Sequence, residues 1–260
     1  QLHAQGCFVL PNPWDVGSAR YLQRQGFQAL ASTSAGCAWS EGRPDGAVSL
    51  QATLDHLRLM AAATDLPLNA DFGDGFGATP DDVGQAVTAA LDTGIAALSI
   101  EDASGLADAP LRPLDEAVQR LRAARAAIDR AAADVLLVGR AENFFVGVPD
   151  LDDTLRRLRA YAAAGADVLY APGITTVEQI QAVVAAAEGT PVNLLVGGPT
   201  SLTLQDIAAL GVRRVSLGGA LARAAWGGLM QATDSLVREG RFDGLQQAAA
   251  GAALNDLFRS

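Results

Sequence analysis

Charged side chains end three of the short apolar runs in this sequence. The runs 66–71, 97–101 and 134–140 are apolar enough for buried strands, and they end at Asp71, Glu101 and Arg140. Carboxylate oxygens are the ligands that a hard divalent cation such as Mg²⁺ prefers, and an arginine grips a carboxylate through parallel hydrogen bonds. If these strand ends meet, they form a site for a metal ion and a small carboxylate substrate.

Smaller polar groups follow or lie within two other runs. The run 29–33 leads through Thr33 into Ser34, Ala35 and Gly36, whose backbone N–H groups we expect to face an oxyanion. Asn193, in the run 192–196, either contacts the ligand or satisfies a buried backbone group. The backbone N–H groups and the Asn193 amide both suit a site that binds an anionic substrate.

The charged residues also have a purely structural interpretation. Asp71 and Glu101 can form an ion-pair layer with Arg140, in which no ligand takes part. Arg140 can likewise bridge to Glu142 or to Glu101 alone. The sequence leaves these alternatives open.

Neither the glycines nor the histidines give a sharper motif. The spacing of Gly73, Gly75 and Gly77 does not open a helix as a dinucleotide fingerprint does, so they either approach a ligand or make a turn. His56 lies among apolar residues and is interpreted as a surface or satisfied helical histidine, while His3 is near the terminus. A Ser-His-Asp or Cys-His mechanism is therefore not expected.

The elements that must position these residues alternate between strand and helix. The pattern predicts a (β/α)8 TIM barrel, an α/β fold in which catalytic groups come from the C-terminal ends of the strands. The clearest helix is 114–131, with apolar residues at three- and four-residue steps. A doubly wound open sheet is the alternative. The expected strands are 7–10, 29–33, 66–71, 97–101, 134–140, 168–171, 192–196 and 215–217.

Composition and charge limit the domain organisation, the classes of partner and the compartment that we expect for the chain. We expect one domain over 1–260, in which 218–237 and 242–258 are helices and 218–260 packs on a neighbouring subunit. A net charge of −10 speaks against nucleic acid and anionic membranes as partners. The two cysteines do not form a Cys-x-x-Cys motif, and the first residues lack the pattern of a secretory signal, so we expect a cytoplasmic protein.

Eight short motifs, taken in their order and spacing, resemble the isocitrate lyase/phosphoenolpyruvate mutase superfamily. They are LPNPWD at 10–15, TSAG at 33–36, GRPDG at 42–46, DFGDGFG at 71–77, SIED at 99–102, GR at 139–140, GAD at 165–167 and PVN at 191–193. The resemblance implies a (β/α)8 barrel that uses Mg²⁺, with Mn²⁺ as a substitute. It also implies a homo-oligomer, a dimer or tetramer, in which a C-terminal helix is exchanged between subunits.

The resemblance also implies roles for individual residues. Asp71 resembles the direct metal ligand, and Asp45 and Glu101 resemble carboxylates that hold metal-bound waters. Arg140 resembles the group that grips a substrate carboxylate, and Asn193 a further polar contact. The backbone of Ser34 to Gly36 resembles the donors to the 2-oxo-acid end of the substrate. Asp45, Glu101 and Arg140 are thus the expected catalytic residues.

The sequence departs from this family in the segment after the fourth strand. Lyases that cleave isocitrate carry a Lys-Lys/Arg-Cys-Gly-His lid there, whereas residues 103–112 contain neither Cys nor His. Isocitrate lyase activity is therefore not expected. A second acidic residue of the family is Gly73 in this chain, which leaves Asp74 as a differently placed substitute.

Three functions remain. The first is a Mg²⁺-dependent lyase or hydrolase that cleaves a C–C bond in a small 2-oxo or 2-hydroxy di- or tricarboxylic acid. The second is a non-catalytic binder of a 2-oxo dicarboxylate such as 2-oxoglutarate. The third is an enzyme for a phosphonate or phosphorylated substrate, because Gly197-Gly198 and Gly218-Gly219 follow the last two strands, where barrels commonly bind phosphate.

Overall fold

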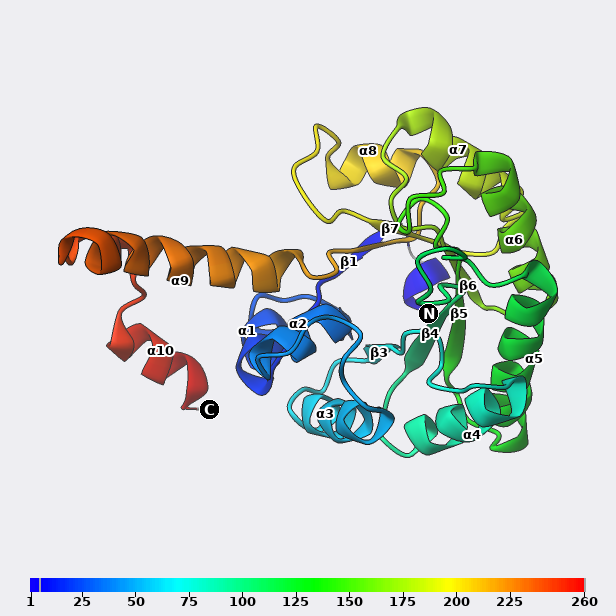
Figure 1. Cartoon of the computed structure of the whole chain (residues 1–260), viewed down its shortest axis with the longest axis horizontal. Coiled ribbons are helices and arrows are strands. Elements are labelled where there is room, and N and C mark those ends of the chain that lie inside the picture. Colours follow the sequence, from blue (N-terminus) through cyan, green and yellow to red (C-terminus); the bar gives the residue numbers. More distant parts are fainter. Residues whose placement is uncertain (5, 260) are drawn as a thin grey trace.

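Strands and helices alternate along the chain in a computed structural model that describes residues 1–4 and 6–259 (Figure 1). The strands within this part are β1 (Phe8–Leu10), β2 (Leu30–Ala31), β3 (Leu68–Asp71), β4 (Ala97–Glu101), β5 (Leu136–Arg140), β6 (Val168–Tyr170), β7 (Val192–Leu195) and β8 (Arg214–Ser216).

The helices begin where the sequence offers N-terminal capping groups. In α4, Thr79 and Asp82 form a reciprocal capping box and Pro80 occupies the first turn, as the sequence pattern indicates. The helices are α1 (Val16–Arg24), α2 (Ser34–Ser40), α3 (Leu50–Ala62), α4 (Pro80–Leu91), α5 (Leu114–Arg130), α6 (Leu151–Ala163), α7 (Val177–Ala186), α8 (Leu204–Ala209), α9 (Ala220–Glu239) and α10 (Gly251–Phe258), with 3₁₀ helices η1 (Leu2–Ala4) and η2 (Asp243–Gln247).

The strands form one parallel sheet that returns on itself. Its order is β1-β8-β7-β6-β5-β4-β3-β2, so the first strand pairs with the last. Across the remaining seam, the Ala31 N–H donates to the Pro11 carbonyl at 3.1 Å. The α/β barrel fold is thus confirmed, and the open doubly wound sheet is excluded because β1 and β8 would not pair there.

The inner and outer faces of the strands differ in character. Outward-facing residues such as Leu98, Leu137 and Leu169 are buried against the surrounding helices. Part of the inner face is apolar, with Val138 and Val168 in a buried cluster, but the part around the cavity carries small or polar residues where barrels of this type usually carry Val, Ile and Leu. These residues, Ala31, Asn69, Ser99, Asn193 and Ser216, line a cavity rather than filling it. The barrel therefore encloses a polar space.

Every expected strand is present, and no end differs by more than two residues: 97–101 matches β4 at both ends, whereas 134–140 corresponds to Leu136–Arg140. The expected helix 114–131 is α5. The single helix expected over 242–258 is wrong, because η2 and α10 are separated there by extended residues, Ala248 and Ala250. η2 lies directly on α9, since a Cβ at Gly244 would be 2.5 Å from the Ala232 carbonyl oxygen. Among the described residues, no helix is long and apolar enough to cross a membrane.

One buried side chain joins three strands at the seam of the barrel. The Asn12 Nδ2 donates to the Ser32 carbonyl at 2.9 Å, and its Oδ1 accepts from the backbone N–H groups of Leu217 and Gly218 at 2.9 and 2.8 Å. Asn12 follows β1, while its partners follow β2 and β8. The side chain thus replaces ladder hydrogen bonds where β1 and β2 do not pair fully.

We predict that Asn12→Ala lowers the free energy of unfolding by about 2–3 kcal/mol, because it leaves one buried and two partly buried backbone groups without their partner. Urea unfolding followed by circular dichroism measures the change. Asn255→Ala, at an exposed position in α10, is the control and should stay within about 0.5 kcal/mol of the parent. Equal effects of the two substitutions would show that Asn12 does not hold the seam.

Candidate functional site

The last residue of β5, Arg140, contacts three carboxylates. Its Nη1 lies 3.2 Å from Asp71 Oδ1 and 3.1 Å from Glu101 Oε2. Its Nη2 donates to Glu142 Oε2 at 3.2 Å, and its Nε donates to Glu142 Oε1. The structure thus brings together the ends of β3, β4 and β5, and it contains the ion pairs of the structural interpretation. We call these four residues the Arg140 cluster.

The Arg140 cluster contains three acids and one cation. Burial raises the pKa of Glu101 to about 8; Arg140 opposes this shift, and the nearby carboxylates of Glu142 and Asp71 add to it. Burial likewise raises the pKa of Glu142. Although burial lowers the pKa of Arg140, Glu101 and Glu142 raise it well above its usual value. Arg140 therefore stays charged, whereas Glu101 is largely protonated at neutral pH.

Aromatic rings cover the guanidinium of Arg140. Its Cζ lies 5.1 Å from the centroid of the Tyr170 ring and 5.8 Å from that of Phe145, in cation–π geometry. The Arg140 side chain is 12% exposed, and those of Asp71 and Glu101 are 19% and 20% exposed. These three groups can therefore reach a small ligand without the cluster being open to bulk water.

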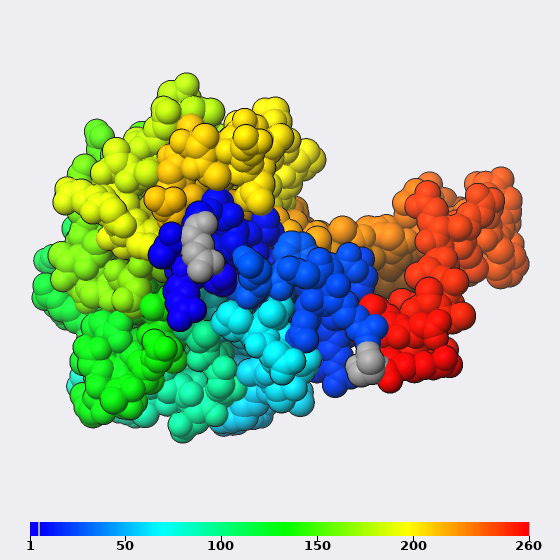
Figure 2. Space-filling view, turned by 180° about the vertical axis from the view of Figure 1, so that it is seen from behind, coloured from blue at the N-terminus to red at the C-terminus, as the bar shows by residue number. Residues whose placement is uncertain are grey.

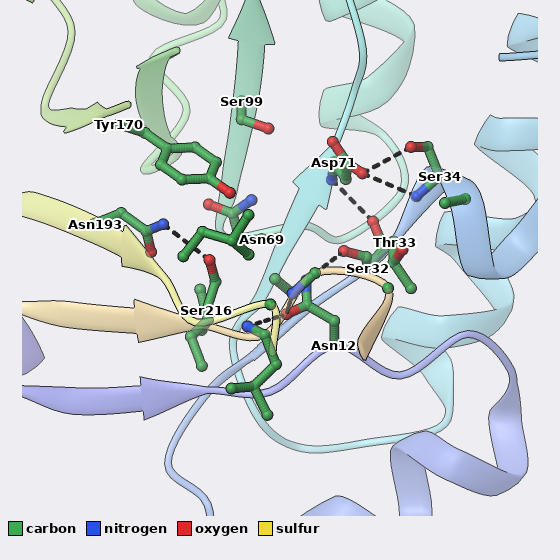
Figure 3. Close-up of a pocket in the computed structure, with 18 of the residues that line it drawn as sticks. Asn12, Ser32, Thr33, Ser34, Asn69, Asp71, Ser99, Tyr170, Asn193 and Ser216 are labelled. Atoms are coloured by element: carbon green, nitrogen blue, oxygen red, sulfur yellow. Dashed lines mark hydrogen bonds between the residues drawn. The ribbon is translucent and has the colours of Figure 1, made fainter. Parts of the chain in front are cut away.

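The carboxylate of Asp71 is held by the start of α2. The Ser34 backbone N–H and Oγ donate to Asp71 Oδ2 at 2.9 and 2.8 Å, and the Asp71 N–H donates to Ser32 Oγ at 2.9 Å (Figure 3). Thr33 caps the helix by accepting from the Gly36 N–H at 3.2 Å. Two of the three N–H groups expected to face an oxyanion, those of Ser34 and Gly36, are thus already used, which leaves that of Ala35.

Close packing explains the glycine at position 36. A Cβ there would lie 2.6 Å from Thr33 Cγ2 and 2.8 Å from Trp14 Cβ, closer than atoms approach in folded proteins. In the glycine-rich turn, Gly73 and Gly75 have positive φ values of 53° and 88°. Gly73 also lines a cavity, so the turn and ligand-approach interpretations both fit.

Asn193 faces the barrel interior. Its Nδ2 donates to Ser216 Oγ at 2.9 Å, and its Oδ1 accepts from Arg214 Nε at 2.9 Å. Its amide therefore bonds to side chains rather than to a buried backbone group. Asp45 lies instead on the exposed loop between α2 and α3, where its Oδ1 accepts from the Gly46 N–H at 2.9 Å. Among the described residues it has no ion pair with the Arg140 cluster.

Two cavities meet at Asp71 and Arg140. The inner one, of about 430 Å³, extends into the barrel, and the outer one, of about 460 Å³, lies toward Glu101 and α3. Ser34 and Asp45 line both of them. Their volumes are those of small-molecule sites, which lie at roughly 300–1,000 Å³.

The cluster is not a preformed metal site. Within residues 1–4 and 6–259, no three His, Cys, Asp or Glu side chains are arranged to hold a metal ion. The Arg140 Nη1 lies between Asp71 and Glu101 and takes the place of a cation there. The substitute carboxylate, Asp74, is likewise engaged, because its Oδ2 lies 2.8 Å from Arg112 Nη2 and 3.2 Å from Arg120 Nη2.

A second buried network supports the cluster from outside the barrel. Asp102, next to Glu101 in sequence, accepts from the Glu142 N–H at 2.8 Å, from Arg157 Nη1 at 2.9 Å and from the Tyr161 hydroxyl. Arg157 and Tyr161 belong to α6. Asp102 thereby fixes the backbone that carries Glu142.

Sequence reasoning missed several side chains that line the cavities. Tyr170, Arg214 and Ser99 lie in the inner cavity, and His56 in the outer one, where its Nε2 has no hydrogen-bond partner in the described structure. Alternation along the strands provides a signal for Ser99, because residues two apart face the same side and Ser99 precedes Glu101 by two.

The protein family described as phosphoenolpyruvate phosphomutase matches residues 1–237. The chain belongs to the phosphoenolpyruvate mutase/isocitrate lyase superfamily. A protein from Burkholderia cenocepacia J2315, assigned only provisionally as a lyase or mutase, has a solved structure with 47% identity and a TM-score of 0.96 over 100% of this chain and 94% of its own. The resemblance found in the motifs is thus confirmed for the superfamily.

Two named relatives are less similar. Oxaloacetate decarboxylase of Bradyrhizobium sp. (strain ORS 278) is 33% identical, over 83% of this chain and 74% of its own. The structure of oxaloacetate acetylhydrolase in complex with the product oxalate has 28% identity and a TM-score of 0.85, over 97% of this chain and 89% of its own. Both names describe enzymes that break a carbon–carbon bond.

We predict that Asp102→Asn destabilises the protein by about 3–5 kcal/mol, because it leaves the buried guanidinium of Arg157 without its full counter-charge. Thermal and chemical unfolding measure the loss. Asp129→Asn is the matched control: Asp129 pairs with Arg125 at 2.8 Å but is 64% exposed, so we expect a change below about 1 kcal/mol. An equally small effect at Asp102 would contradict the supporting role of this network.

Proposed function

We propose that this protein is a Mg²⁺-dependent lyase or hydrolase that cleaves a C–C bond in a small 2-oxo or 2-hydroxy di- or tricarboxylic acid. The observation that carries the proposal is the Arg140 cluster, in which one cation and three carboxylates meet at the junction of two small cavities. The named relatives, a decarboxylase and an acetylhydrolase of oxaloacetate, support this substrate class.

The donor groups of the cluster suit Mg²⁺. Asp71 and Glu101 supply carboxylate oxygens, and a divalent cation bound between them would replace the proton that burial keeps on Glu101. We propose that Asp71 and Glu101 hold the metal, Asp71 directly, and that Asp45 joins them from its loop. Mn²⁺ would be accepted by the same oxygens. When bound, the metal supplies stabilisation of negative charge on a substrate oxygen.

The residues of the chain have separate tasks in this proposal. Arg140, released from Asp71 Oδ1, binds a carboxylate of the substrate through its planar guanidinium. Ser34 keeps Asp71 in position by donating from both its N–H and its hydroxyl. Phe145 and Tyr170 limit the access of water to Arg140, which strengthens its attraction for a carboxylate.

A binder of 2-oxo dicarboxylates without turnover is the second candidate. It is favoured by the engagement of Arg140 with its own carboxylates and by the hairpin after β4. This hairpin, closed by a bridge between Ala103 and Leu111, lacks a Cys or His that could act as an acid. An assay of turnover separates the two candidates.

We predict release of pyruvate, glyoxylate or oxalate from at least one acid in a panel of 2-oxo and 2-hydroxy di- and tricarboxylates, in the presence of Mg²⁺. Asp71→Asn should lower this turnover by roughly a hundredfold or more, because the charge developed in the transition state loses stabilisation. Coupled assays and product chromatography measure the rates. Binding of these acids without turnover of any would favour the second candidate.

Binding of the metal can be measured separately from turnover, through its effect on thermal stability. Mg²⁺ at roughly a hundred times its Kd should stabilise the parent by about 2.7 kcal/mol, seen as a rise in Tm, and Asp71→Asn should abolish that rise. Asp134→Asn, an exposed carboxylate before β5 at the opposite end of the barrel, is the matched control and should keep it. An unchanged Mg²⁺ response in Asp71→Asn would remove Asp71 from the metal site.

We also propose that residues 218–260 pack on a neighbouring copy of the chain in a homo-oligomer. Figures 1 and 2 show α9 and α10 projecting from one side of the barrel. Among its described residues, α9 buries only Ala222, and the apolar side chains left exposed on α9, η2 and α10 include Leu229, Met230, Val237, Leu245 and Phe258. So large an uncovered apolar surface marks an interaction site.

We predict that the parent protein has the mass of a dimer or tetramer in light scattering and that Leu229→Glu, in α9, dissociates it. A charge in the covered apolar interface would lack a partner, which costs several kcal/mol. Leu59→Glu is the matched control, because Leu59 is similarly exposed, at 62% against 53%, but lies on α3. A monomeric parent would contradict the proposed assembly.

A further inference from the structure

A buried arginine lies in the barrel interior without an acidic partner. Arg214, the first residue of β8, is 4% exposed, and its Nε donates to Asn193 Oδ1 at 2.9 Å. Within the described part of the chain, no carboxylate forms an ion pair with it. A buried guanidinium normally has such a partner, because leaving a charge unpaired in a low-dielectric interior is costly.

Arg214 lies in the same cavity as Arg140. Both line the inner cavity of about 430 Å³. They are also connected by the register of the sheet, since Arg140 pairs with Tyr170, Tyr170 with Asn193, and Asn193 with Arg214 on successive strands. The strands of a barrel are inclined to its axis, so such a row descends from the mouth toward the floor. Arg140 is thus at the mouth of the cavity and Arg214 near its floor.

The walls between the two arginines are polar. Asn69, Ser99, Tyr170, Asn193 and Ser216 converge on a common space in Figure 3. Asn69 is 6% exposed, and its Oδ1 has no hydrogen-bond partner in the described structure. A buried polar group without a partner indicates that a ligand or water belongs there.

Arg214 remains charged at neutral pH despite this environment. Burial lowers the pKa of Arg214 to about 10, and Tyr170 opposes that shift. Burial and the nearby Arg214 lower the pKa of His3 to about 4, so His3 is neutral and adds no second positive charge. The positive charge at the floor of the cavity is therefore uncompensated by the described protein groups.

We propose that Arg214 and Asn193 form a second anion subsite at the floor of the inner cavity. The subsite binds an anionic oxygen group, a carboxylate or a phosphoryl group, at the far end of the ligand whose first carboxylate is bound by Arg140. This inference rests on the proposed function for the Arg140 end of the ligand. It restricts the substrate to acids with two anionic ends, and it makes Arg214 a specificity-determining residue.

The test compares matched unreactive ligands by calorimetry and thermal shift, in the presence of Mg²⁺. Succinate and succinamate have the same size, but succinamate lacks one charge, and phosphonoacetate carries a phosphoryl group in place of a carboxylate. We expect the parent to bind succinate or phosphonoacetate at least about tenfold more tightly than succinamate, as for a charge-assisted bidentate contact. Whichever of the two gains more identifies the anionic group.

Variants then assign the preference to Arg214. Arg214→Met should bring the ratio of the two affinities close to one, and Arg214→Lys should restore part of it. Asn193→Asp places a counter-charge beside Arg214 at nearly constant volume and should lose the preference as well, which provides a test if Arg214→Met does not fold. Arg213→Met, at the exposed neighbouring position, is the matched control and should keep the parent ratio.

The results separate this inference from the proposed function. An equal ratio in the parent, Arg214→Met and Asn193→Asp would overturn the subsite, even if the protein turns over a 2-oxo acid. Conversely, a preference for dianions that depends on Arg214, together with no turnover of any acid in the panel, would leave the subsite standing and overturn the proposed enzyme.

Discussion

The sharing of one guanidinium among three carboxylates is the constraint on which the site depends. Arg140 holds the ends of β3 and β4 and the segment after β5 together, through Asp71, Glu101 and Glu142. In a buried setting, such a cluster is tolerated only while its charges nearly balance. Because a single arginine cannot balance three ionised acids, burial raises the pKa of Glu101. In the proposed function a metal ion supplies the missing positive charge, and Arg140 is then free to bind an anion. Under this proposal, structural ion pairing and ligand binding are two states of the same residues.

The C-terminal end of β4 contributes one side chain to the candidate site and the next to the network that supports it. Glu101 and Asp102 are adjacent, so their side chains point to opposite faces of the sheet. Glu101 faces the barrel and Arg140, while Asp102 faces α6 and holds Arg157 and Tyr161. A displacement of α6 would therefore shift the backbone that carries Glu142, which couples the outer helical layer to the charges inside the barrel.

The sequence was sufficient for the order of strands and helices and for the acids and arginine at the strand ends. Period and composition are local, and a parallel barrel brings its strand ends to one rim whatever the loops do. Contacts that form only when the barrel closes could not be predicted from local patterns. Asn12 is an example, because its partners lie some 20 and 200 residues away along the chain. Arg214 was not predicted as a site residue, because the expected strand 215–217 begins one residue after it. The helix expected over 242–258 failed because contact with α9, not local propensity, divides it.

Helix α9 joins the barrel interior to a surface that lies outside it. Arg223 in its first turns lines the inner cavity and donates to the Gly197 carbonyl, whereas the rest of the helix carries uncovered apolar side chains. Any partner that covers those side chains also fixes the position of that wall. Association and ligand affinity then become thermodynamically linked, and each must strengthen or weaken the other by the same factor.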